Sequence, residues 1–411
     1  MKILYILPSF QHPAVRGPNR HYHFIRELSQ RHAITLLTLA RSEISKSALD
    51  EMAGYTERML IFEVDGASGA QAAAMPAKLP RVGGRIERTA QFRKALAQMK
   101  SAFAGLMQQG ACDQVLFHGK SVFSVIEDWD DLPLAIDFCD ATSMRLRTEM
   151  RYAGPRRRLG LALRYFQTRQ VEKKLVGKTP HIAFISHRDR EAVLGPEDQS
   201  ELLPNGVDVQ YWKRASSRPQ SNCLIFTGVM NYKPNDDAAR YLIDRILPIV
   251  RRSAAGLEVL LVGRDPSPAL LERAGHYPDV TVTGTVDDMR PHLERAAVCA
   301  APLRVASGMQ NKVLEAMAMG VPVVTTSIVA AGLRVDGAGD TPVHVADGEQ
   351  AFAERIIQLL GQDEERARLA AEGRRFVENH FVWSRSAEKL EQMCLAAARG
   401  SARRGQKVIR N

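Results

Sequence analysis

Short apolar runs that end in glycine or a polar residue recur along the chain, and segments with helical spacing separate them. Clear examples are Ile3–Leu7, Ile34–Leu39, Cys223–Thr227 and Val259–Val262. Runs of this length that are apolar throughout are typical of parallel strands, which are buried on both faces. The alternation therefore predicts an α/β fold made of parallel sheets covered by helices.

Length and charge narrow this prediction further. With 411 residues, the chain is longer than one typical hydrophobic core, so two domains are expected. Hydrophobic residues make up 45% and charged residues 25%, as in ordinary globular proteins. The net charge of +10 favours an anionic partner, for which nucleic acid, anionic lipid and phosphorylated sugars all qualify.

The stretch 307–323 predicts a loop, a helix and the start of a strand. Ser307 and Gly308 suit a turn and a helix N-cap. Lys312 and Glu315 then share one face near the helix N-terminus, where amide groups and the helix dipole favour an anion such as phosphate. Glu315 could accept hydrogen bonds from vicinal hydroxyls such as those of a ribose. A nucleoside diphosphate is the simplest ligand, and an ordinary surface helix is the alternative.

The run from Glu315 to Val323, EAMAMGVPV, resembles the donor-site signature of family 4 retaining GT-B glycosyltransferases. Glu315 matches the second glutamate of that signature, which holds the nucleotide ribose, and Ser307 stands where the first glutamate is usual. The version with Ser307, Gly308 and Lys312 resembles a bacterial subgroup of sugar transferases associated with exopolysaccharide loci and exosortase systems. That resemblance extends nearly from end to end of the chain.

The resemblance implies a GT-B fold, in which two Rossmann-like domains with parallel sheets face an interdomain cleft. It places an acceptor-binding domain at 1–205, a nucleotide-sugar-binding domain at 206–382, and a crossover helix with a basic tail at 383–411. The donor would be a nucleotide sugar, acting as co-substrate, and no other cofactor is implied. The acceptor would be a glycan or a polyprenyl-diphosphate-linked sugar.

The resemblance also implies which residues hold the donor. Where the family often carries an arginine after the strand at 223–227, this chain has Val229, so the diphosphate would fall to lysines and arginines nearby. Backbone groups of Thr285 and Val286 would read the nucleobase. The donor-binding candidates are Glu315, Ser307, Gly308, Met309, Gln310, Asn311, Gly228, Lys233, Arg264, Thr285, Val286, Arg304, Gly17 and Arg20.

Gly17 and Arg20 follow the first predicted strand, where Gly17 permits close backbone approach and Arg16 or Arg20 can meet phosphate. This loop lacks the G-x-G-x-x-G fingerprint, which argues against an NAD enzyme. The alternative is a plain strand-to-helix loop without a ligand.

Three residues are candidates for the chemistry itself. Lys312, with the helix N-terminus, could stabilise the charge that develops on a leaving diphosphate. His118 and Asp140 follow predicted strands, at the edge where open α/β sheets place ligands, and could act on the acceptor. Their alternative roles are a structural histidine and a helix N-cap.

Two segments are strongly basic and carry apolar residues at intervals, residues 78–104 and 145–178. The second holds eleven basic residues (Arg145, Arg147, Arg151, Arg156, Arg157, Arg158, Arg164, Arg169, Lys173, Lys174, Lys178) against Glu149 and Glu172. Such segments can be solvated helix faces or surfaces that dock on anionic lipid. We expect membrane docking, and no nucleic-acid partner because no nucleic-acid motif accompanies the charge.

Other constellations predict neither a metal site nor a disulfide framework. The acidic pairs Asp128 with Asp130 and Asp236 with Asp237 fall in expected loops or helix starts, so no metal is assigned. The five cysteines are scattered without C-x-x-C spacing, which is typical of reduced thiols in a cytosolic protein. The expected location is the cytoplasm, with peripheral attachment to the inner face of the plasma membrane.

These points together predict a retaining, metal-independent glycosyltransferase in bacterial exopolysaccharide or cell-surface glycan synthesis. Two other functions remain open. A nucleotide-sugar epimerase would share the fold but need no acceptor. A catalytically degenerate GT-B protein that only binds a membrane or polymer would account for Ser307 and Val229 at positions where the family has charged residues.

Overall fold

The computed structural model describes residues 1–15, 19–64, 82–151, 153–215, 222–306 and 308–408. The chain divides into two compact units. The N-terminal unit comprises Met1–Leu203 together with the segment that begins at Ser386, and the C-terminal unit comprises Pro204–Arg385.

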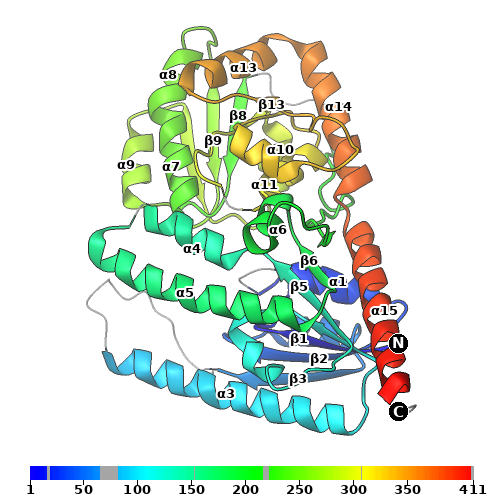
Figure 1. Cartoon of the computed structure of the whole chain (residues 1–411). Helices are drawn as coiled ribbons and strands as arrows, with labels where there is room; N and C mark the ends of the chain where they lie inside the picture. The colour runs from blue at the N-terminus through cyan, green and yellow to red at the C-terminus, as the bar shows by residue number, and fades with distance from the viewer. Residues whose placement is uncertain (16–18, 65–81, 152, 216–221, 307, 409–411) are drawn as a thin grey trace. The chain divides into compact units, whose positions relative to one another are not determined.

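The N-terminal unit is built on a seven-stranded sheet with the order β3-β2-β1-β4-β5-β6-β7 (Figure 1). Every strand pairs in parallel with its neighbours. The strands are β1 (Lys2–Leu7), β2 (Ala33–Ala40), β3 (Arg58–Glu63), β4 (Gln114–Phe117), β5 (Leu134–Cys139), β6 (Ile182–Phe184) and β7 (Glu201–Leu202). Side chains of β1 are buried from Ile3 to Leu7, as expected for a central parallel strand.

Except for α15, which is the last element of the chain, the helices of this unit lie between successive strands. They are α1 (Arg20–Leu28), α2 (Lys46–Ala53), α3 (Val82–Gln108), the 3-10 helix η1 (Lys120–Val125), α4 (Thr142–Arg151), α5 (Pro155–Lys178), α6 (His187–Leu194) and α15 (Trp383–Val408). The described side chains of α3 include Ala95, Met99 and Phe103, which lie in one apolar cluster with residues of β1, β2 and β4. Helical spacing therefore buries one side of α3 against the sheet.

The C-terminal unit is built on a six-stranded parallel sheet with the order β10-β9-β8-β11-β12-β13. Its strands are β8 (Cys223–Thr227), β9 (Glu258–Val262), β10 (Val280–Gly284), β11 (Val298–Ala301), β12 (Val323–Thr325) and β13 (His344–Val345). Its helices are α7 (Lys233–Tyr241), the π-helical η2 (Leu242–Ile246), α8 (Leu247–Val250), α9 (Pro268–Gly275), α10 (Arg290–Arg295), α11 (Asn311–Ala318), α12 (Ser327–Ala330), the 3-10 helix η3 (Ala331–Leu333), α13 (Glu349–Gly361) and α14 (Asp363–His380).

Both sheets reverse the direction in which strands are added, and they do so at one point each. The reversal lies between β1 and β4 in the first sheet and between β8 and β11 in the second. Open α/β sheets bind ligands at the carboxyl ends of the strands that flank such a switch point. The predicted class, two Rossmann-like α/β domains with parallel sheets, is confirmed.

Three local expectations were wrong. Helix α11 begins at Asn311 rather than at Ser307 or Gly308, because Gly308 adopts a φ of 62°, outside the helical region. The sequence also predicts one long amphipathic segment from Phe376 to Leu395, but α14 ends at His380 and α15 begins at Trp383. Phe381 turns its side chain into the core there, and its carbonyl accepts a 2.6 Å hydrogen bond from Val207 N.

The C-terminal tail also differs from expectation. The basic residues from Arg399 to the end of the chain predict a mobile tail, but helix α15 continues to Val408. Residues 216–220 are typical of a surface linker and lie outside the described residues. None of the described helices combines the length and the hydrophobicity that crossing a bilayer requires.

Candidate functional site

In the C-terminal unit, the loops that follow β8 and β11 meet at the switch point. Gly228 directly follows β8 and has a φ of 156°. A Cβ on Gly263 would lie only 1.8 Å from the carbonyl oxygen of Gly228. Only glycine fits at Gly263, so the β8 and β9 loops pack backbone to backbone. Helix α11 also lies close to the loop after β8, because a Cβ on Gly228 would come within 3.1 Å of Lys312 Nζ.

Lys312 is the second residue of α11, and its ammonium group lies beside Gly228, in the loop that follows β8. Lys312 Nζ donates a hydrogen bond to Asn235 Oδ1 and lies 4.9 Å from the centre of the Phe226 ring. Asn235 in turn donates from Nδ2 to the carbonyl of Val229 at 2.9 Å. Burial lowers the pKa of Lys312 to about 8, although Cys299 and Glu315 oppose the shift. The positive charge therefore lies at the switch point with a neutral amide as its hydrogen-bond partner.

Glu315 lies one turn further along α11 and is half-buried. Burial raises the pKa of its carboxyl group to about 7, and the charge of Lys312 acts in the opposite direction. The two side chains share a helix face, as predicted. A carboxylate and an ammonium group withdrawn from water in this way suit a ligand that carries both hydroxyl groups and negative charge.

The neighbouring loop residues surround this pair on several elements. Met309 packs on the core of the unit, Gln310 is the N-cap of α11, and Asn311 accepts a 2.9 Å hydrogen bond from Asn205 Nδ2. Gly308 provides the left-handed turn before the helix, and Ser307 lies outside the described residues.

The basic donor candidates of this unit differ in how they are engaged. Arg304 pairs with Asp237, and Arg264 pairs with Asp265 at 3.3 Å. Lys233 is exposed at the first position of α7.

Thr285 and Val286 follow β10 at the far edge of the sheet, two strands from β8. Thr285 is exposed, and Val286 packs partly on the core of the unit. A ligand that reached them from Lys312 would have to extend across the end of β9.

In the N-terminal unit, His118 follows β4 directly at the switch point. Its Nδ1 donates a 2.8 Å hydrogen bond to the carbonyl of Asp137, which leaves Nε2 as the acceptor nitrogen. Burial lowers the pKa of His118, although Asp137 opposes the shift. The next residue, Gly119, has a φ of 112°, and a Cβ on it would lie 2.6 Å from Pro8 Cγ, so the β1 and β4 loops are in close contact.

Arg20 is placed in the core rather than in an open loop. It is the first residue of α1, is 4% exposed, and donates from Nε to Asp137 Oδ2 at 2.8 Å and from Nη2 to the carbonyl of Leu203 at 2.7 Å. The expected diphosphate contact is thus replaced by a buried ion pair. Gly17, its companion in the prediction, lies outside the described residues.

His21, His118 and Asp137 bring ligand atoms within 4.8 Å of one another, as a metal site would. The carboxylate of Asp137 already accepts hydrogen bonds from Arg20 and from the Cys139 backbone. A cation there would face the Arg20 guanidinium at close range, so these residues fit a metal poorly. Of the acidic pairs seen in the sequence, Asp128 pairs with Lys100 and Asp236 with Arg240.

Asp140 lies between β5 and α4 with its carboxylate engaged by neighbours. Arg145 donates to it at 2.9 Å, and Thr142 donates from Oγ1 at 3.2 Å. Lys120 Nζ lies 4.0 Å from the same carboxylate and donates to the Asp140 carbonyl at 2.7 Å. Asp140 is therefore held near α4 by cations of its own unit.

Comparison with known proteins identifies the C-terminal unit. Residues 221–362 match the family "Glycosyl transferases group 1". Over this range the C-terminal unit is similar to glycosyl transferases of group 1. Lys312 and Glu315 lie inside the matched range.

Similar proteins extend the comparison beyond that domain. A GDP-mannose-dependent alpha-(1-6)-phosphatidylinositol monomannoside mannosyltransferase of Mycobacterium tuberculosis is 27% identical over 257 residues, which cover 54% of this chain and 63% of that protein. Among solved structures, HepE of Anabaena in complex with UDP and glucose has a TM-score of 0.62 at 14% identity, with 96% of this chain and 100% of that chain covered.

A sucrose-phosphate synthase from Thermosynechococcus elongatus has a TM-score of 0.65 at 16% identity, over 95% of this chain and 98% of that chain. These two structures show the fold. The chain spans less than two thirds of the length of the mycobacterial relative.

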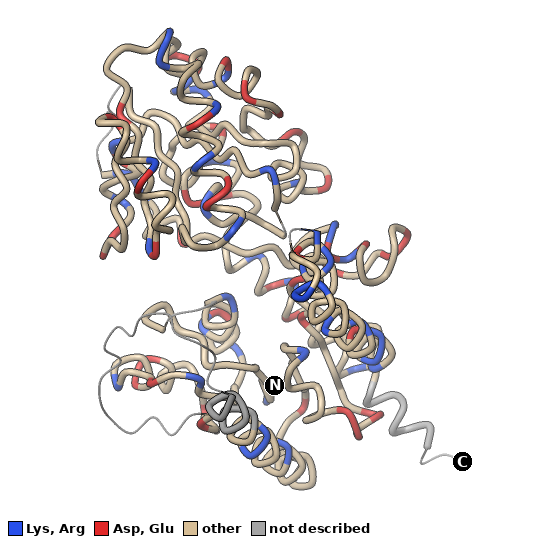
Figure 2. The backbone as a smooth tube through the Cα atoms, turned by 90° about the vertical axis from the view of Figure 1, so that its left-hand side faces the viewer, with Lys and Arg blue, Asp and Glu red and all other residues tan. Residues whose placement is uncertain are grey.

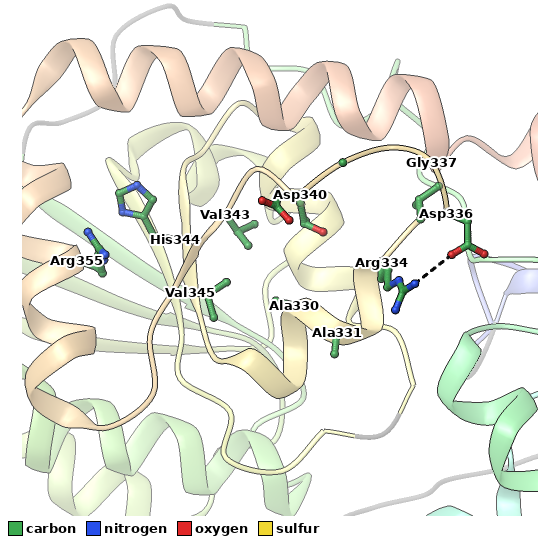
Figure 3. Close-up of a pocket in the computed structure, with 13 residues that line it drawn as sticks. Ala330, Ala331, Arg334, Asp336, Gly337, Asp340, Val343, His344, Val345 and Arg355 are labelled. Atoms are coloured by element: carbon green, nitrogen blue, oxygen red, sulfur yellow. Dashed lines mark ion pairs between the residues drawn. The ribbon is translucent and has the colours of Figure 1, made fainter. Parts of the chain in front are cut away.

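A hollow of about 670 Å³ lies elsewhere in the C-terminal unit, beside β13 (Figure 3). Arg334 and Asp336 line it and form a 3.7 Å ion pair, and Arg355 lies at its opposite end. None of the predicted donor residues lines this hollow, so it is separate from the Lys312 site.

Sequence reasoning missed three residues that shape the two switch points, namely Asn235, Asp137 and His21. The sequence could have pointed to Asp137, because this charged residue interrupts the apolar run Leu134–Cys139. No local pattern points to Asn235, since its amide contacts Lys312 across 77 positions of sequence. The ring of His21 lies 4.0 Å from that of His118, between centroids, and its Nδ1 lies 2.6 Å from the Tyr5 hydroxyl.

Proposed function

We propose that the chain is a glycosyltransferase that moves a sugar from a nucleotide-sugar donor to a glycan or lipid-linked acceptor. The observation that carries the proposal is the placement of Lys312 and Glu315 at the switch point of a unit similar to glycosyl transferases of group 1. A half-buried ammonium group beside a helix N-terminus suits a diphosphate. The carboxylate one turn away suits the hydroxyl groups of a ribose.

The proposed donor lies across the carboxyl ends of β8 and β9. Its diphosphate meets Lys312 and the first amide groups of α11, which have no partner within the helix. Its ribose meets Glu315, and its base extends toward Thr285 and Val286 at the end of β10. Gly228 and Gly263 support this mode of binding, because side chains there would occupy the space beside Lys312 Nζ and the β8 loop.

In the proposed reaction, the bond between the sugar anomeric carbon and the diphosphate oxygen breaks. The leaving diphosphate gains negative charge, and Lys312 with the α11 amides stabilises that charge. The acceptor hydroxyl forms the new bond and loses its proton. Retention of the anomeric configuration belongs to the proposal through the resemblance to family 4 enzymes.

The N-terminal unit would bind the acceptor. His118 is neutral when burial lowers its pKa, and its Nε2 is the nitrogen that can accept a hydrogen bond from a hydroxyl group. Asp140 is the weaker candidate for a base because Arg145 and Lys120 already engage it.

The names of similar proteins bear on the donor and acceptor. The mycobacterial relative is named for GDP-mannose and a phosphatidylinositol acceptor, whereas the Anabaena structure holds UDP and glucose. We therefore include both guanine and uracil donors among the candidates, and we place the acceptor among glycans built on lipid carriers. We also propose a role in bacterial exopolysaccharide or cell-surface glycan synthesis, which the resemblance of the sequence to that subgroup of sugar transferases implies.

A thermal-shift panel of UDP-, GDP- and ADP-linked sugars tests the proposal first. A ligand present at a hundred times its Kd adds about 2.7 kcal/mol to the stability of the domain that binds it, which raises Tm by several degrees. A nucleotide sugar that raises Tm is then incubated with the protein, with and without acceptor. Transfer or slow hydrolysis supports the proposal. Interconversion of the donor sugar without acceptor would indicate an epimerase, and no shift with any nucleoside diphosphate would indicate a degenerate binding protein.

A further inference from the structure

Helix α5 carries an exposed apolar stripe that no part of the proposed reaction uses. Leu159 is 77% exposed, Leu163 is 61% exposed and Phe166 is 64% exposed. They are three of only seven large hydrophobic side chains that are exposed among the described residues. Water in contact with such a stripe is unfavourable, and contiguous exposed apolar surface marks an interaction site.

The spacing puts all three side chains on one face of α5. Successive residues of an α-helix turn by about 100°, so Leu159, Leu163 and Phe166 fall within about 60° of one another. Leu161 and Leu175 are buried and point to the opposite side. The helix therefore packs on its own unit through one face and presents a second apolar face to solvent.

The first two turns of α5 are exposed on every side. All residues from 154 to 160 are exposed, including Arg156, Arg157 and Arg158. Helices of this kind are stabilised mainly by tertiary packing, and the described residues bury none of the side chains from 154 to 160. Its stability would increase if an external surface covered it.

The charge of α5 indicates which kind of molecule would cover its apolar stripe. The only acidic residue of α5 is Glu172, which is buried, whereas Arg156, Arg158 and Arg164 are exposed in the same turns of the helix as the apolar stripe. On α4 and α5, Lys and Arg positions far outnumber Asp and Glu positions (Figure 2). A second copy of the chain would bring arginine against arginine, and a nucleic acid backbone would gain nothing from the leucines.

We propose that the exposed face of α5 docks on an anionic phospholipid bilayer, with Leu159, Leu163 and Phe166 inserted below the headgroups and the long side chains of the neighbouring arginines paired with lipid phosphates. Interfacial helices have this composition, with apolar residues on one face and arginines near it. The surface goes beyond the proposed glycosyl transfer and does not depend on it.

Helix α3 provides an internal contrast. Its described side chains also include exposed cations, Arg93 and Lys94, but its apolar residues Ala95, Met99 and Phe103 are buried in the core. Charge without exposed apolar residues gives at most weak, salt-sensitive attraction to a membrane. The proposal therefore assigns docking to α5 and not to the described part of α3.

The test is flotation of the full chain with vesicles of phosphatidylcholine, alone or mixed with phosphatidylglycerol. We expect binding only to the mixed vesicles, and weaker binding as salt increases. Replacing Arg156, Arg158 and Arg164 by glutamine should lower the partition coefficient about a hundredfold, since each arginine near an anionic surface contributes about fivefold. Replacing Leu159 and Phe166 by serine should lower it by a similar factor.

Matched variants keep the test specific. Leu271→Ser alters an apolar side chain that is 48% exposed in the other unit, and Arg93→Gln with Lys94→Gln alters cations on α3. Both controls should bind vesicles as the unmodified chain does. All the substituted side chains are exposed, and unchanged Tm values will show that the variants fold.

Three outcomes would overturn the proposal. They are equal binding to both vesicle types, unchanged binding after Leu159→Ser with Phe166→Ser, and self-association or nucleic-acid binding that this pair abolishes while vesicle binding persists. Donor binding measured on the same samples separates the two hypotheses. A chain that binds a nucleotide sugar but ignores vesicles refutes the docking surface alone.

Discussion

The two switch points hold buried charge in opposite ways. In the N-terminal unit, Arg20 and Asp137 form a 2.8 Å ion pair in which both side chains are at most 5% exposed. Burial alone would lower the pKa of Arg20, but Asp137 raises it overall. In the C-terminal unit, the hydrogen-bond partner of Lys312 is the neutral amide of Asn235, and burial lowers the pKa of Lys312 to about 8.

The difference shows which charge is structural and which is available. In a buried ion pair with additional hydrogen bonds, each charge already has its partners, so a ligand would add no stabilising contact. A half-buried ammonium group with no carboxylate within ion-pair distance loses part of its hydration without a counter-charge, so a bound anion would stabilise it. We infer that the first switch point is built to fix α1 on the sheet and the second to receive a diphosphate.

The largest expected effect is on stability, from Arg20→Ala. Removing the guanidinium leaves Asp137 buried without its partner, which should cost about 3–5 kcal/mol. Urea denaturation measures this loss, with Arg264→Ala as the control because its exposed pair with Asp265 should contribute less than about 1 kcal/mol. A stable Arg20→Ala variant with weakened donor binding would instead make Arg20 a ligand contact and remove the contrast.

Next in size is the effect of Lys312→Ala on turnover. Loss of one charge that stabilises the leaving group should lower kcat about 100- to 1000-fold. Stability should change little, since the variant also removes a charge that burial disfavours. Lys213→Ala, at an exposed lysine of the same unit, is the control and should leave kcat unaltered. Full activity in Lys312→Ala would refute the role of this ammonium group.

The same comparison shows what the sequence could predict. The two-domain class was predictable because apolar strand runs such as Cys223–Thr227 are local signals. The pairing of Lys312 with Glu315 was predictable too, since both lie on one helix turn. Arg20 was placed wrongly in an open loop because its partner Asp137 lies 117 residues away, and no local pattern reports such a contact.

The basic segments show a second limit of the sequence. Residues 78–104 and 145–178 have the same mixture of arginines, lysines and apolar residues. In α3 the described apolar side chains face the core, whereas in α5 Leu159 and Phe166 face solvent. Composition predicts that a basic helix exists, but only tertiary packing decides which of its faces remains open.

A smaller effect is expected from Glu315→Gln, in two measurements. A hydrogen bond to a charged group contributes about 1.5–3 kcal/mol, so donor affinity should fall about tenfold or more. The measurement is made at pH 7.5, between the pKa values of about 7 and about 8.

The stability of Glu315→Gln should also differ, because burial raises the pKa of Glu315 from 4.5 to about 7. The folded state then binds more protons than the unfolded state between these values, so stability falls as pH rises through them. This part of the pH dependence should vanish in Glu315→Gln.

Lys312 acts in the opposite sense at higher pH. Its folded pKa of about 8 lies below the usual 10.5, so the unfolded state binds more protons between these values and stability rises with pH. Both groups are charged between about pH 7 and pH 8, where donor affinity should peak. A flat affinity profile from pH 6 to pH 9, which spans both pKa values, would contradict the proposed roles of the pair.

The smallest expected effect comes from Asn235, which only supports Lys312. Asn235→Ala removes a hydrogen bond that favours the charged ammonium group, so the pKa of Lys312 should fall further and the alkaline limb of the activity profile should move to lower pH. The loss of activity at pH 7 should be about fivefold, the value of one net hydrogen bond of about 1 kcal/mol. Asn235→Asp should move the limb to higher pH while weakening donor binding, because a carboxylate at this position would pair with Lys312 and convert the second switch point into a copy of the first. If neither variant moves the limb, Lys312 is not the group that titrates there.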